Sequence, residues 1–277
     1  MDYFSLDHVC GLRMTITYPS RTYWLRAVAI FFGMLTLGWL ALAGFDGTLK
    51  AEDSPWFKPA KLSATMAAFS WCLGAYLSYL PFYQQRLTAS VLATLALLTS
   101  GGVFVWMVAR QVLLDAVLPP IVYDHTGLML YYVNKGAVML LLAVVAYLLW
   151  QLNRTDRRKL SLPYLFGIRS GLALFLASGL MGLLVGRGTQ GPYPPYTYGF
   201  EGFPFFNWRV LDLKLRGIYF LASHAIIYLP IVGNLLGRIQ DHKYVPMSTG
   251  FIAVLSIMLL ILLAVGWVAQ VTGRAVI

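Results

Sequence analysis

Seven blocks of mainly apolar residues alternate with short polar segments along this chain. A membrane-spanning helix needs about 20 consecutive apolar residues, and each block approaches that length. Because a helix satisfies its own backbone groups in lipid, we predict an all-α bundle of about seven spanning helices that forms one transmembrane domain over residues 1–277. The expected spans are 23–44, 61–81, 88–109, 128–150, 165–186, 214–237 and 249–270.

Composition supports a membrane protein. Hydrophobic residues make up 59% of the chain and charged residues 12%, whereas soluble domains carry about 25% charged residues. The net charge of +10 comes mostly from residues between the apolar blocks, which favours contact with membrane lipids and excludes a nucleic-acid partner. Cys72 lies inside an apolar block and Cys10 is the only other cysteine, so we expect neither a disulfide nor a metal site.

Basic residues in the segment 151–164 predict the orientation of the chain. Arg154, Arg157, Arg158 and Lys159 lie within six positions, and short cytoplasmic loops are enriched in lysine and arginine. This segment is therefore placed in the cytoplasm. Seven spans then put the N-terminus inside the cell and the C-terminus outside.

Several polar side chains are expected at membrane depth. Ionisable residues inside spans are rare and usually face a bundle interior or water. Lys135 lies in the fourth predicted span beside Tyr131, and His224 follows Arg216 and Tyr219 on one side of the sixth. The second and third spans add Ser63, Thr65, Ser70, Tyr76, Thr94, Thr99 and Ser100.

Two interpretations of these polar faces remain open. If the faces converge, they form a cationic cavity that opens outward, with its floor near His224 and with Lys58 and Lys61 at its rim. Alternatively, the hydroxyls are ordinary interhelical hydrogen-bonding groups, and Lys135 and Arg216 extend to the interface.

The absence of Asp or Glu clearly inside a span disfavours a carboxylate-based cation pathway and favours an anionic ligand. The sequence names no cofactor. The candidate ligand-binding residues are Lys58, Lys61, Tyr131, Lys135, Arg187, Arg216, Tyr219 and His224.

A segment rich in Pro, Gly and aromatic residues joins the fifth and sixth predicted spans. It runs from Gly186 to Trp208, and its composition argues against a regular helix. One interpretation is an interfacial loop whose rings lie among lipid headgroups. The other is a lid over a cavity between helices.

A box at 54–61, Ser-Pro-Trp-Phe-Lys-Pro-Ala-Lys, resembles the Pro-Trp-x-Lys-Pro-x-Lys signature of a family of bacterial multi-pass membrane proteins. Later similarities are Gly186-Arg187-Gly188, Trp208, Asp212-Leu213 and Ser223-His224-Ala225. The chain departs from the family pattern at 214–217. The resemblance implies a bacterial inner-membrane location and implies no activity.

Three functions are compatible with this sequence. The first is a protein that binds or transports a small anionic or amphipathic ligand in the cationic cavity. The second is an enzyme acting on a lipid or quinone at the outer leaflet, with His224 or His125 as acid–base. The third is an accessory subunit of a larger membrane complex or a homo-oligomer, in which Gly179, Gly182 and Gly186 permit close helix packing.

Overall fold

The computed structural model describes residues 23–45, 56–80, 83–114, 125–154, 160–185, 215–239 and 245–272. These residues form seven helices, and they contain no strand. The helices are α1 (Tyr23–Phe45), α2 (Phe57–Leu77), α3 (Tyr83–Leu114), α4 (His125–Arg154), α5 (Leu162–Val185), α6 (Leu215–Ile239) and α7 (Val245–Thr272).

Each predicted span overlaps one helix, which confirms the all-α fold. Five helices, namely α1, α3, α4, α5 and α7, are long and apolar enough to cross a membrane. The other two, α2 and α6, are not among these five over their described residues, and both contain polar side chains. These side chains are Lys61, Ser63, Thr65 and Ser70 in α2, and Ser223, His224 and Asn234 in α6.

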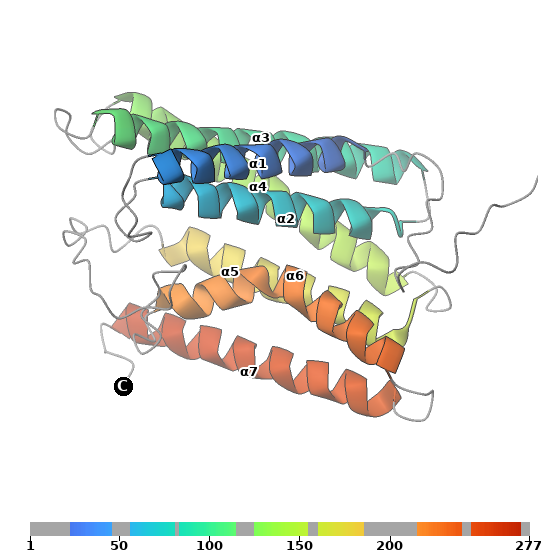
Figure 1. Ribbon diagram of the computed structural model, residues 1–277. Helices are drawn as coiled ribbons and strands as arrows, with labels where there is room; N and C mark the ends of the chain where they lie inside the picture. The colour runs from blue at the N-terminus through green and yellow to red at the C-terminus, as the bar shows by residue number, and fades with distance from the viewer. Residues whose placement is uncertain are drawn as a thin grey trace, which may run out of the picture.

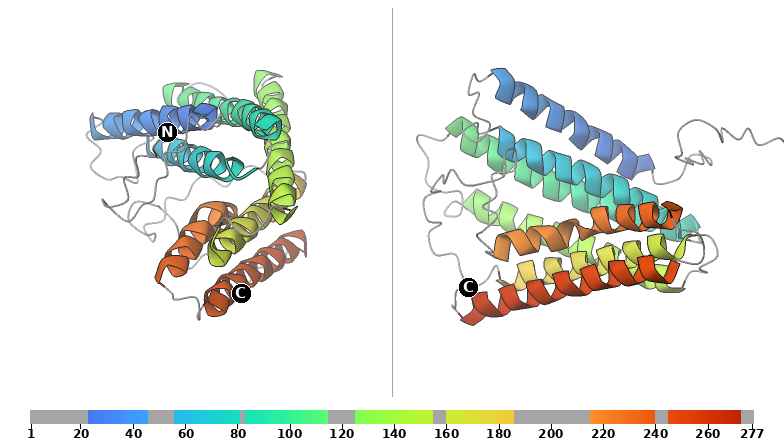
Figure 2. Two further views of the ribbon diagram at one scale, coloured as in Figure 1. Left: turned by 90° about the vertical axis from the view of Figure 1, so that its right-hand side faces the viewer. Right: turned by 60° about the horizontal axis from the view of Figure 1, so that its bottom comes forward.

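The helices lie side by side in two layers (Figure 1). Helices α1, α2 and α3 form the upper layer, and α5, α6 and α7 form the lower layer. Helix α4 crosses obliquely between them along one edge, as the end-on view in Figure 2 shows. The layers join where α4 packs on α5 and where α2 packs on α6, and α2 also meets α5 through Phe69–Phe175 and Tyr79–Tyr164.

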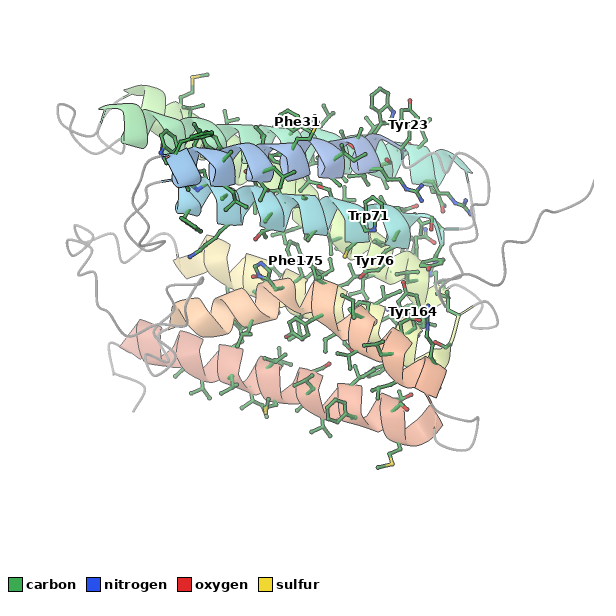
Figure 3. All side chains as sticks on the ribbon, in the orientation of Figure 1. Tyr23, Phe31, Trp71, Tyr76, Tyr164 and Phe175 are labelled. Carbon is green, nitrogen blue, oxygen red and sulfur yellow. The ribbon has the colours of Figure 1, made fainter. Side chains whose placement is uncertain are left out.

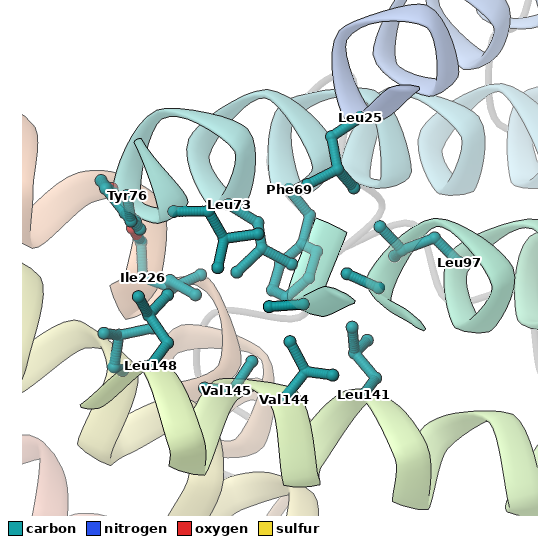
Figure 4. Close-up of a cluster of buried hydrophobic side chains, with 14 of the residues drawn as sticks. Leu25, Phe69, Leu73, Tyr76, Leu97, Leu141, Val144, Val145, Leu148 and Ile226 are labelled. Carbon is teal, nitrogen blue, oxygen red and sulfur yellow. The ribbon is translucent and has the colours of Figure 1, made fainter. Parts of the chain in front are cut away.

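A large apolar cluster fills the upper layer and extends to the lower one. Phe32 of α1, Leu73 of α2, Leu97 of α3 and Leu148 of α4 are almost fully buried. Ile226 of α6 belongs to the same cluster and lies near Tyr76 in Figure 4. The cluster thus fixes α6 against the upper layer, and it places the polar residues of α2 and α6 near one another.

Helix α2 begins earlier than the predicted span, at Phe57 rather than at position 61. Pro59 is tolerated because first-turn N–H groups have no partner inside a helix. Trp56, from the box at 54–61, stacks on Trp39 of α1 with ring centroids 5.6 Å apart. The box therefore helps to anchor the start of α2 against α1.

Helices α5 and α6 approach to backbone contact. A Cβ atom on Gly167 would lie 2.6 Å from the carbonyl oxygen of Leu229, and one on Gly171 would lie 2.7 Å from that of Ala225. From α6, a Cβ on Gly233 would collide with the Pro163 carbonyl. The closest packing is therefore at glycines that the sequence analysis did not single out.

Of the glycines expected to allow close packing, Gly179 does so. Its Cβ position is 2.5 Å from Leu142 of α4. The surroundings of Gly182 and Gly186 lie outside the described part of the chain.

Candidate functional site

A polar contact joins α2 to α6. His224 Nε2 lies 3.5 Å from Thr65 Oγ1, and Ser223 Oγ lies 3.1 Å from His224 Nδ1. Thr65 also donates its hydroxyl proton to the Lys61 carbonyl at 3.0 Å. A hydroxyl that donates elsewhere still has lone pairs. Because the Thr65 hydroxyl proton is already donated, His224 Nε2–H is the donor in the contact with Thr65.

Lys61 and Thr65 are one helical turn apart and share a face of α2. Lys61 is nearer the N-terminal end of α2, and its side chain is half-buried. Lys61 is thus one turn from Thr65, on the side of the bundle expected to face outward. Two of the predicted ligand-binding residues contact Thr65, His224 through its imidazole and Lys61 through its backbone carbonyl.

A second polar contact joins α3 to α4. Ser100 donates to Asn134 Oδ1 at 2.8 Å, and Ser100 is buried. Lys135 follows Asn134 and is half-buried. Asn134 and His224 are each nine residues from the start of their helices, a depth of about 13 Å at 1.5 Å per residue.

The two polar contacts belong to different helix pairs. The neighbours that contact α4 most are α3 and α5, whereas His224 on α6 faces α2. The structure therefore places Asn134 and His224 in two separate contacts, Ser100–Asn134 and Thr65–His224.

The remaining predicted ligand-binding residues have no described side chain. Lys58, Tyr131, Arg216 and Tyr219 lie on α2, α4 and α6 as expected, but their side chains are outside the described part. Arg187 and the aromatic segment 186–208 also lie outside the described residues.

All charged residues in the helices are basic. Every one of the 11 Asp and Glu residues lies outside the seven helix ranges. The basic residues in the helices are Arg26, Lys58, Lys61, Arg86, Arg110, Lys135, Arg154, Arg169, Arg216 and Arg238.

Two of these basic residues bind backbone carbonyls. Arg86 donates to the Leu80 carbonyl after α2, and Arg169 donates to the Leu152 carbonyl in the last turn of α4. Last-turn carbonyls lack a partner within their helix. Both arginines therefore stabilise helix ends.

Several hydroxyls of the polar faces bond within their own helix. Ser70 donates to the Met66 carbonyl at 2.7 Å and Thr65 to that of Lys61. Ser63 and Thr94 have buried hydroxyls with no hydrogen-bond partner among the described residues. Ser70 is therefore explained as a structural hydrogen-bonding group, whereas the hydroxyls of Ser63 and Thr94 are not.

One interhelical contact was not foreseen. Tyr76, expected on the polar face of the second span, donates its hydroxyl to the Ile226 carbonyl on α6 at 2.7 Å. Three residues further along α2, the Tyr79 and Tyr164 hydroxyls are 3.4 Å apart. In the sequence, Pro230 was a signal for the Tyr76–Ile226 contact. A proline inside a helix removes an N–H and leaves the carbonyl four residues earlier without its usual donor.

Within the described residues, no group of three His, Cys, Asp or Glu side chains is placed to hold a metal ion. No family model, curated protein or solved structure matches this chain. The family suggested by the box at 54–61 therefore stays a prediction.

Proposed function

We propose that this chain is a seven-span bacterial inner-membrane protein that binds or transports a small anionic or amphipathic ligand. The binding site would lie where α2 meets α6, at Lys61, Thr65 and His224. The observation that carries the proposal is the contact of His224 with Thr65, one turn from Lys61, in helices whose charged residues are all basic.

The lengths of α2 and α6 support seven spans rather than five. The two helices have 21 and 25 residues, which correspond to about 31 and 37 Å at 1.5 Å per residue. A hydrocarbon core is about 30 Å thick. Both run beside the apolar helices in Figure 1, so the polar side chains that lower their hydropathy would lie within the bundle.

Chemistry favours an anionic group at this site. A lysine ammonium, an imidazole N–H and two hydroxyls are donors, and a ligand that entered between Thr65 and His224 would take the place of their mutual contact. Donors without a carboxylate suit a phosphate or carboxylate headgroup, and the apolar surroundings suit an attached hydrocarbon. An acid–base role for His224 is less well supported, because its described partners are the hydroxyls of Ser223 and Thr65.

Native mass spectrometry of the protein in mild detergent tests the proposal. We expect a discrete bound mass that is strongly depleted in Lys61→Gln and in His224→Ala. Arg154→Gln is the matched control, because Arg154 stacks 4.0 Å over Trp150 at the opposite end of the bundle. An adduct lost equally in all three variants, or retained in both site variants, contradicts the proposed site.

A further inference from the structure

Pro230 interrupts the hydrogen-bond ladder of α6. In a regular helix the Ile226 carbonyl would accept from the N–H of residue 230, and proline has none. Ile226 is fully buried. A buried carbonyl without a donor is costly, especially where lipid replaces water.

Tyr76 supplies the missing donor from another helix. Its hydroxyl reaches the Ile226 carbonyl at 2.7 Å, and its side chain is only 3% exposed. Figure 4 shows Tyr76 directed from α2 toward the turn of α6 that carries Ile226. The Tyr76 hydroxyl therefore replaces the N–H donor that Pro230 lacks.

This bond lies on the edge where the two layers are held by few polar contacts. At the other edge, α4 and α5 are consecutive helices, linked by the Arg169–Leu152 hydrogen bond and by the close approach of Leu142 to Gly179. Along α2, two other described polar contacts to the lower layer are longer, at 3.5 Å for Thr65 and 3.4 Å for Tyr79. Figure 3 shows Tyr76, Phe175 and Tyr164 between the layers.

We infer that Tyr76 is a latch that holds the α2–α6 seam closed by satisfying the carbonyl that Pro230 leaves free. The seam is formed by Thr65 and Tyr76 of α2 and by His224 and Ile226 of α6. Its opening, with α4 and α5 as the hinge, separates His224 from Thr65 and gives a ligand access between the two layers. The identity of that ligand rests on the proposed function, whereas the latch does not.

The native thiol of Cys72 reports on the seam. Cys72 precedes Tyr76 by one turn on the same face of α2 and is half-buried. In a Cys10→Ser background, we would measure the maleimide alkylation rate of Cys72 in mild detergent. Wild-type Cys72 should react much more slowly in the folded protein than in SDS, because the closed seam shields it.

Tyr76→Phe should raise the alkylation rate about tenfold, because a carbonyl left unpaired in the closed seam is relieved when the seam opens. Pro230→Ala restores an N–H to the same carbonyl. The double variant Tyr76→Phe/Pro230→Ala should therefore return to the wild-type rate. Tyr228→Phe, which removes an α6 hydroxyl bonded to the Leu221 carbonyl of its own helix, should have no effect.

The alkylation rates of the single and double variants either support or overturn the role of Tyr76. An unchanged rate in Tyr76→Phe overturns the latch, as does an equal increase in the single and double variants. If Tyr76→Phe alone fails to fold, a folded double variant with the wild-type rate supports the latch, and a double variant that also fails to fold overturns it. No ligand is used, so a failed latch leaves the proposed binding site untouched, and a failed binding assay leaves the latch untouched.

Discussion

Gly171 offers a sharp test of the α5–α6 contact. An alanine Cβ at this position would lie 2.7 Å from the Ala225 carbonyl oxygen and 2.9 Å from Ile226 Cα. Ordinary contacts begin near 3.4 Å, and both opposing atoms are backbone. A side chain cannot rotate away to make room, so Gly171→Ala must push the two helices apart.

The size of the effect follows from two opposing terms. Overpacking typically costs about 1–3 kcal/mol, and a retreat of 0.5–1 Å forfeits roughly a quarter to a half of the dispersion attraction at the contact. Replacing glycine by alanine inside a helix stabilises the helix by about 1 kcal/mol. Gly136→Ala on α4 is the matched control, since no atom lies within 4 Å of its Cβ position.

We expect Gly171→Ala to be about 1–3 kcal/mol less stable than Gly136→Ala. Unfolding by SDS titration in mixed micelles, followed by tryptophan fluorescence, measures the difference. Helix α6 lies between α5 and α2, so its retreat from Gly171 should also disturb His224 and reduce ligand binding. Equal stability of the two variants would refute backbone contact at Gly171.

Two further predictions concern the α3–α4 contact and the number of spans. Ser100→Ala should lower the free energy of unfolding by about 0.6 kcal/mol in the same titration. In an Asn134→Leu background the same substitution should have no effect, because its partner is already absent. A loss of stability that persists in that background would show that the two residues are uncoupled. Seven spans place Tyr23 and Leu162 on one side of the membrane, because four helices separate them. A cysteine-free chain carrying Tyr23→Cys or Leu162→Cys should therefore react with an impermeant maleimide from the same side, whereas labelling from opposite sides would mean that α2 does not cross.

The number of helices and their approximate ends could be predicted because both depend on local sequence. Length and hydropathy determine where an apolar helix forms, and each predicted span overlaps a helix. The ends differ where local rules compete with the apolar pattern. Helix α2 starts at Phe57 because Pro59 is accepted in a first turn, and α3 extends to Leu114, beyond its predicted end at 109.

The partners of the polar side chains could not be predicted from a single sequence. The helical period predicted that Arg216, Tyr219 and Ser223 share one side of α6, with His224 at its edge. It carried no information on which faces meet, because the contacts join residues 150 and 159 positions apart. The prediction of one cavity from the fourth and sixth spans stays a prediction, and the described contact of Asn134 on α4 is with Ser100 on α3.

The α2–α6 seam joins two helices whose polar side chains lie between the layers. Helices α1 and α7 expose broad apolar faces, for example Met34 and Leu37 on α1 and Val254 and Met258 on α7. Polar side chains on such faces would meet lipid and would be costly. On α2 and α6, Thr65, Tyr76 and His224 instead satisfy one another or a backbone carbonyl. The polar side chains of α2 and α6 therefore have partners inside the bundle, and they mark one place where the two layers are held by hydrogen bonds.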